Sequence, residues 1–329
     1  MYKKLLLIGL IFVLGLVAIT GCDSDKSSEP TPISEFDMIV EAVTNYLTNY
    51  QTGAGRGVNT QIAAVFDLLN DGDASNDPMI LDYRAADAFA SGHIAGAVNI
   101  ALGDLVAKIE DGTITNNKPI LNVCYTGQSA SVATSLLNML GFDAQNLLFG
   151  MCAVDTSILG ADRWVGQIDS DERAGDLTAV PTVATQTYEY PTLSTGEESA
   201  EEIIKARFSA TAWNISANDV WDNPGNYFIV NYWPADLYLV PGHIPGAVQF
   251  TPNSSLQTES MLNLLPTDKT IVVYCFTGQT SAQVTAALKI LGYDAKSLLY
   301  GHNGFAYNTY ASARYNAPAP GTYDAILVK

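Results

Sequence analysis

The feature that most restricts the fold of this chain is an internal repeat. Residues 92–98 (GHIAGAV) return as residues 242–248 (GHIPGAV), and residues 124–129 (CYTGQS) return as residues 275–280 (CFTGQT). The segment LLFG, which ends at Gly150, likewise returns as LLYG, which ends at Gly301. The offset of about 150 residues is too long for a solenoid repeat and predicts two tandem domains.

Each copy alternates short apolar runs with helical patterns. Residues 79–82 and 120–123 of the first copy, and 227–230 and 271–274 of the second, are typical of buried strands. After each repeated cysteine, apolar residues recur at positions i, i+3, i+4 and i+7, which predicts a helix. Strand–helix–strand units with short connections indicate a parallel sheet covered on both faces.

Composition and charge exclude several functions. The 329 residues include 34 Asp and Glu against 16 Lys and Arg, a net charge of −18, so a nucleic-acid partner is not expected. The chain has only 3 His, well separated, and none of its 4 Cys are in C-x-x-C spacing. We therefore expect no His-based metal cluster, no all-cysteine zinc site and no C-x-x-C-H haem site.

The N-terminus resembles the signal peptide and lipobox of a bacterial lipoprotein. Lys3 and Lys4 precede an apolar run at residues 5–19, and Gly21 precedes Cys22. The resemblance implies a signal peptide at 1–21, an acylated Cys22 that anchors the protein to a lipid bilayer of the bacterial cell envelope, and a tether at 22–34. The alternative is a plain signal peptide or a signal anchor with an incidental cysteine.

The remaining chain divides into a first domain at 35–165, a linker at 166–199 and a second domain at 200–329. The linker is rich in Asp, Thr, Pro and Gly and is only weakly periodic.

Cys124 and Cys275 are the predicted catalytic residues. Each follows an apolar strand and precedes a Gly-containing loop and a helix. Ligands of parallel α/β proteins bind at this edge of the sheet, where loop N–H groups and the helix dipole favour a negative charge. This position predicts a reactive thiolate. The alternative is an inert cysteine buried at the end of a strand.

Taken together, these motifs resemble the rhodanese (thiosulfate sulfurtransferase) family. The first copy carries residues 82–84 (DYR), 92–97, Cys124-x-x-Gly127 and 148–150, and the second carries 242–247, Cys275-x-x-Gly278 and 299–301. The resemblance implies two tandem three-layer α/β/α domains, each around a five-stranded parallel sheet. It also implies that Cys124 and Cys275 carry sulfane sulfur as a persulfide from a donor to an acceptor thiol, with no metal or cofactor. The implied donor-binding loops consist of Tyr125, Thr126, Gly127, Gln128 and Ser129, and of Phe276, Thr277, Gly278, Gln279 and Thr280.

Both loops depart from the pattern of family members that act on thiosulfate, which often carry Arg or Lys there. Neither loop holds a cation, so polysulfide or a persulfide is favoured over thiosulfate as the donor. Related phosphatases need an Arg where this chain has Ala130 or Ser281, which excludes phosphoryl chemistry.

Four further residues are possible accessories. Asp82 and Arg84 either form an ion pair that orders the loops or an ordinary surface salt bridge. Cys152 either resolves a persulfide or pairs with Cys124, or is an unpaired buried thiol. His302 either touches a substrate or lies in a surface loop.

The sequence thus predicts an envelope-anchored sulfurtransferase. The alternatives are a non-catalytic scaffold of the same fold in a membrane-associated complex, whose protein partner is unknown, and a thiol redox sensor that depends on Cys152.

Overall fold

The structure is a computed structural model that describes residues 32–52, 54–168 and 171–329. The predicted signal peptide, Cys22 and most of the tether lie outside the described residues. Within the described ranges no helix is long and apolar enough to cross a membrane. Residues from Ser34 to Lys329 form one compact unit.

The first half of this unit is built on a parallel sheet with the strand order β1-β6-β5-β2-β4. The central strands are apolar and buried because helices cover both faces of the sheet. The elements in chain order are α1 (Glu35–Asn49), β1 (Asn59–Thr60), α2 (Ile62–Leu69), β2 (Met79–Asp82), α3 (Ala86–Ala90), β3 (His93–Ile94), β4 (Val98–Asn99), α4 (Leu105–Glu110), β5 (Ile120–Val123), α5 (Gln128–Met139) and β6 (Ala144–Leu147).

The second half repeats this topology, with the strand order β7-β11-β10-β8-β9, again parallel throughout. Two five-stranded parallel sheets with flanking helices confirm the predicted fold class. The elements are α6 (Ala200–Arg207), β7 (Asn214–Ile215), α7 (Ala217–Asp222), β8 (Tyr227–Asn231), α8 (Ala235–Leu239), β9 (Val248–Gln249), β10 (Thr270–Tyr274), α9 (Gln279–Ile290), β11 (Ala295–Leu298), α10 (Asn303–Ala306) and β12 (Leu327–Val328).

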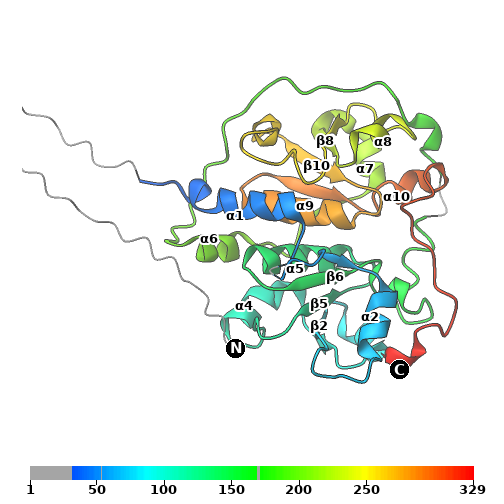
Figure 1. Cartoon of the computed structure of the whole chain (residues 1–329). Helices are drawn as coiled ribbons and strands as arrows, with labels where there is room; N and C mark the ends of the chain where they lie inside the picture. Colours follow the sequence, from blue (N-terminus) through cyan, green and yellow to red (C-terminus); the bar gives the residue numbers. More distant parts are fainter. Residues whose placement is uncertain (1–31, 53, 169–170) are drawn as a thin grey trace, which may run out of the picture. The chain divides into compact units, whose positions relative to one another are not determined.

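The two halves share one layer of helices. Figure 1 shows α1, α5, α6 and α9 between the two sheets, and α5 packs directly against α9. Small buried residues such as Ala130 and Ala282 line the facing helices, and Leu136 and Leu288 belong to one continuous apolar core. The Tyr46 hydroxyl of α1 lies 2.9 Å from Ser135 Oγ of α5. The domains that the repeat predicts are therefore joined by a common core.

Each half also receives a segment that follows the other half in the chain. Thr178 of the linker pairs antiparallel with His243, and both bonds run main chain to main chain. The C-terminal strand β12 pairs antiparallel with β3, which contains His93. The end of the chain, grouped by sequence with the second domain, therefore packs on the first.

This shared core predicts that the protein unfolds in one cooperative step. Calorimetry should give a single transition. Leu288→Ala should lower the free energy of unfolding of the whole unit by about 2–5 kcal/mol, because a fully buried side chain is lost. Two resolved transitions, with only one moved by Leu288→Ala, would contradict a common core.

Candidate active site around Cys275

The two repeated cysteines lie at the same place in their sheets and in the same hydrogen-bond geometry. Cys124 follows β5 and accepts N–H bonds on Sγ from Gly127 (3.1 Å) and Ala130 (3.4 Å). Cys275 follows β10 and accepts them from Gly278 (3.2 Å) and Ser281 (3.4 Å). In each loop the glycine donor is the N-cap residue directly before α5 or α9, and the second donor lies in the first turn of that helix. The N–H groups at the start of a helix have no intrahelical acceptors. They stabilise a negative charge on the sulfur.

The glycine in each loop is required by the backbone. Gly127 and Gly278 have φ values of 78° and 80°, where residues with a side chain are strained. A Cβ on Gly278 would lie 2.9 Å from Tyr300 N, so the loop also has no room for one.

The repeated LLFG and LLYG segments, and the residue after each, bring the main chain into hydrogen-bond contact with the cysteine loops. The N–H of Met151 donates to the carbonyl of Cys124, and the N–H of His302 donates to the carbonyl of Cys275, both at 2.9 Å. Gly150 and Gly301 adopt φ values of 56° and 54° directly before these residues. The motif is thus explained by a close approach of two main chains.

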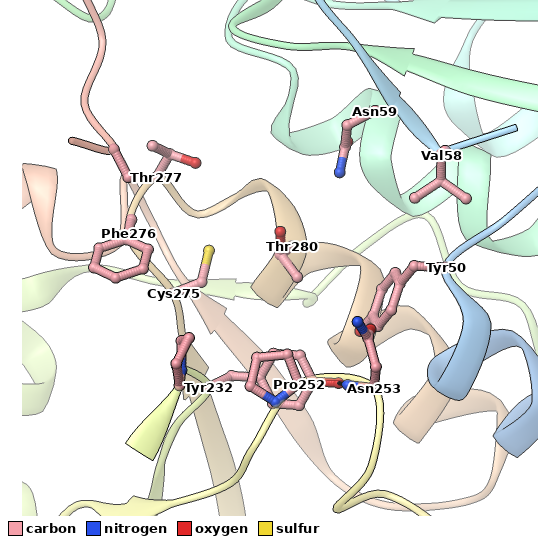
Figure 2. Close-up of a pocket in the computed structure, with 13 residues that line it drawn as sticks. Tyr50, Val58, Asn59, Tyr232, Pro252, Asn253, Cys275, Phe276, Thr277 and Thr280 are labelled. Atoms are coloured by element: carbon pink, nitrogen blue, oxygen red, sulfur yellow. Dashed lines mark hydrogen bonds between the residues drawn. The ribbon is translucent and has the colours of Figure 1, made fainter. Parts of the chain in front are cut away.

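Cys275 lines a pocket of about 460 Å³. Figure 2 shows its sulfur between Phe276 and Thr280, with Tyr50 and Val58 on the opposite side of the pocket. The loop contributes three of the predicted residues, and the walls come from both halves of the chain. The lining residues are Tyr50, Gly57, Val58, Asn59, Tyr232, Pro234, Pro252, Asn253, Cys275, Phe276, Thr277, Thr280 and Ala313.

The pocket is electrically neutral. None of the described residues that line it is an Asp, Glu, Lys, Arg or His. Burial raises the pKa of Tyr50 and of Tyr232 above their usual value, so both hydroxyls stay protonated at neutral pH. Apolar and aromatic walls with a few hydroxyl and amide groups suit an uncharged ligand.

The hollow beside the first cysteine loop differs from the pocket at Cys275. Tyr125, Thr126, Gln128 and Ser129 line a smaller hollow of about 230 Å³, but Cys124 is not part of its lining. Both cysteines are buried, with 1% of Cys124 and 4% of Cys275 exposed, so the two sites differ in whether the sulfur lines a pocket. Arg163 also lines this hollow, with its guanidinium carbon 3.6 Å from the centre of the Tyr125 ring. The cation that the loop sequence lacks is therefore supplied by the segment that follows β6, near the end of the first domain.

The two loops contact each other through their glutamines. Gln279 Nε2 donates to the Thr126 carbonyl (2.9 Å), and Gln128 Oε1 accepts the N–H of Tyr300 (2.8 Å). Gln279, predicted as a donor-binding residue, is thus turned toward the first domain and away from the Cys275 pocket. The close packing of α5 on α9 places both glutamines in this interface.

The accessory residues lie away from the Cys275 pocket. Arg84 binds both carboxylate oxygens of Asp82 and the carbonyl of Gly92, and the ion pair is buried. It fixes the chain before β3 and is no surface salt bridge. Cys152 is a free thiol, as are Cys124 and Cys275, and burial raises the pKa of Cys152 to about 12. A protonated, sealed thiol is a poor nucleophile.

His302 is fully buried and does not reach the pocket. Its Nε2 lies 2.6 Å from Thr309 Oγ1, and its ring meets the edges of Trp233 and Phe305. Trp233 in turn stacks on Phe276, with ring centres 4.4 Å apart, so His302 supports the loop from behind.

Sequence reasoning missed the pocket residues outside the repeated motifs. Tyr50, Val58 and Asn59 come from the segment between α1 and α2, and Ala313 comes from the C-terminal segment. The amphipathic pattern of residues 35–49 was the available signal for α1, but nothing in the sequence indicated that its C-terminal end would cover the cysteine of the other half.

Comparison with known proteins identifies the family of this chain. The Rhodanese-like domain matches residues 65–154 and 216–307, more than half of the chain, so this chain belongs to the rhodanese-like family. The family resemblance predicted from the motifs is thereby confirmed. Comparison with curated proteins gives no match.

Several solved structures each resemble about one domain of the chain. A protein from Staphylococcus saprophyticus is 20% identical over 28% of this chain and 88% of its own, with a TM-score of 0.26. A rhodanese-related protein from Thermoplasma volcanium is 22% identical over 30% and 94%, with a TM-score of 0.25. A protein from Lactobacillus plantarum is 28% identical over 28% and 81%, with a TM-score of 0.24.

Burial of His302 predicts a specific loss of stability in acid. Burial lowers the pKa of His302 to about 4, whereas the unfolded chain binds this proton near the usual value of about 6.5. Stability is therefore lost as the pH falls from about 6.5 to about 4, by about 3 kcal/mol in total. Denaturant unfolding at pH 7 and pH 4 measures this loss in the wild type and in His302→Gln. Between the two pH values the variant should lose about 3 kcal/mol less free energy of unfolding than the wild type. Equal losses would contradict a lowered pKa of His302.

Proposed function

We propose that this protein is an envelope-anchored sulfurtransferase in which Cys275 carries sulfane sulfur as a persulfide. The observation that carries the proposal is the combination at Cys275 of a sulfur held by main-chain N–H donors and a pocket that opens onto it. Nucleophilic catalysis by cysteine needs a stabilised thiolate that a substrate can reach. Cys124 has the donors without the opening.

The reaction proceeds in two displacements at sulfur. The Cys275 thiolate attacks the outer sulfur of a donor R–S–SH, a new S–S bond forms, and the donor S–S bond breaks. The leaving thiolate R–S⁻ takes a proton from solvent. An acceptor thiolate then attacks the outer sulfur of the Cys275 persulfide and releases the Cys275 thiolate, so no external oxidant or reductant is consumed.

The donor class follows from the charge of the pocket. Thiosulfate is a dianion, and the Cys275 pocket has no cation among its described lining residues to replace the lost hydration. The net charge of −18 for the whole chain repels anions further. An organic persulfide or a polysulfide that enters in a protonated form is the better donor.

Sulfur from a suitable donor should load onto Cys275. After incubation with polysulfide, peptide mass spectrometry should find one added sulfur atom on Cys275, and Cys275→Ser should abolish transfer to a thiol acceptor. Cys124→Ser, the matched change in the first loop, should keep most of the activity. Thiosulfate should load Cys275 far more slowly than polysulfide. Full transfer activity of Cys275→Ser would contradict Cys275 as the sulfur carrier, whereas wild-type protein that takes up no sulfur from any donor would favour a non-catalytic scaffold.

The anchoring is a separate part of the proposal and rests on the lipobox-like sequence at Gly21 and Cys22. Cys22→Ser removes the thiol that would be acylated, so the variant should leave the membrane fraction that holds the wild type. Gly21→Ala, which keeps a small residue before the cysteine, is the control and should remain anchored. Membrane association that is equal in Cys22→Ser and the wild type would contradict lipidation at this residue.

A further inference from the structure

The two cysteine loops have the same backbone geometry, so the difference in access to their sulfur atoms must come from the residues that cover the loops. Val58 directly precedes β1, and Trp213 directly precedes β7. The Val58 carbonyl accepts the N–H of Asn146, and the Trp213 carbonyl accepts the N–H of Ser297, both at 2.7 Å. Asn146 and Ser297 occupy matching places in β6 and β11. Val58 and Trp213 therefore hold equivalent positions.

Each of the two residues covers the cysteine loop of the opposite half. Val58 lines the pocket at Cys275, together with Thr277 and Thr280 of that loop. Trp213 lines the hollow at the first loop, together with the matching residues Thr126 and Ser129. The arrangement is reciprocal because the shared helix layer brings the first strand of each half, β1 or β7, beside the cysteine loop of the other half.

The space near Val58 is open, and the space near Trp213 is filled. Trp213 is 8% exposed and packs in one apolar cluster with Val132, against which Leu102 also packs. The repeat offset matches Leu102 with Pro252, which lines the open pocket, and Val132 with Gln283. Gln283 is polar, and its Nε2 donates to Asn59 Oδ1 beside the open pocket (2.9 Å). The indole and its apolar neighbours thus occupy the volume that is empty at the second site.

We infer that Trp213 determines which cysteine a substrate can reach: its side chain closes the first site over Cys124, and Val58 at the equivalent position leaves Cys275 open. The inference rests on the proposed function only for the nature of the substrate. On this inference the first domain holds a closed copy of the site, in which Cys124 keeps its main-chain N–H donors but is covered by Trp213.

Access can be measured without any sulfur transfer. The full chain is treated in its native state with iodoacetamide, a small neutral reagent, and the labelling rate of each cysteine is read from its own peptide by mass spectrometry. In the wild type, Cys275 should react at least about tenfold faster than Cys124, since a sealed thiol reacts only through local opening.

Two reciprocal variants exchange the covering residues. Trp213→Val should accelerate the labelling of Cys124 at least about tenfold, and Val58→Trp should slow the labelling of Cys275 by a similar factor. Trp221→Val is the matched control, because Trp221 lies on α7 and packs against Phe305, remote from the first loop. It should leave the labelling rate of Cys124 unchanged.

Cys152 reports on general loosening, because it is fully buried and lines neither site. Its labelling should stay slow in Trp213→Val. A parallel rise at Cys152, equal labelling of Cys124 and Cys275 in the wild type, or unchanged rates in both exchange variants would overturn the assignment of Trp213.

A second readout tests the chemistry of the opened site. Trp213→Val combined with Cys275→Ser should take up sulfur from polysulfide on Cys124, which Cys275→Ser alone should not. If wild-type Cys275 takes up no sulfur from any donor, the proposed function fails, while the labelling rates still decide whether Trp213 closes the first site.

Discussion

The packing of α5 against α9 is the interaction on which the rest of the structure depends. It joins the two sheets through one apolar core and brings the two cysteine loops together. The same packing places the chain before β1 beside the pocket at Cys275 and the chain before β7 beside the first cysteine loop. Neither site is complete within its own domain. The two halves therefore act as one structure, although the sequence repeats as two.

Reciprocal contacts give two nearly identical loops different surroundings. The main-chain donors at the two sulfurs are the same within about 0.1 Å, so the cradle itself does not distinguish Cys124 from Cys275. The distinction comes from side chains supplied by the partner half, a valine at one site and a tryptophan at the other. A substitution at Val58 or Trp213 leaves the strand, the glycine turn and the helix around each cysteine undisturbed.

Electrostatics act in the same direction. The chain is strongly acidic, and the accessible pocket offers hydroxyl, amide and aromatic groups without a formal charge among its described residues. Arg163 lines the hollow at the first loop, whereas no Lys or Arg is among the described residues that line the pocket at Cys275. Charge and the pocket lining together distinguish the site at Cys275 from a site built for small dianions.

Much of this fold could be predicted from the sequence because its signals are local. Apolar runs such as residues 271–274, the loop glycine Gly278 and the helical spacing after each cysteine specify strand, turn and helix with few long-range contacts. The covering residues could not be predicted, because Val58 and Trp213 lie in short segments without periodicity and are brought to their sites by packing between halves. The pairing of β12 with β3 has the same origin.

A crystal structure of the protein soaked with polysulfide would test the central claim most directly. The account predicts density for one additional sulfur atom bonded to Cys275 Sγ, within hydrogen-bond distance of main-chain N–H groups of the 276–281 segment, and no addition at Cys124. An added sulfur on Cys124 with Cys275 unmodified would contradict it.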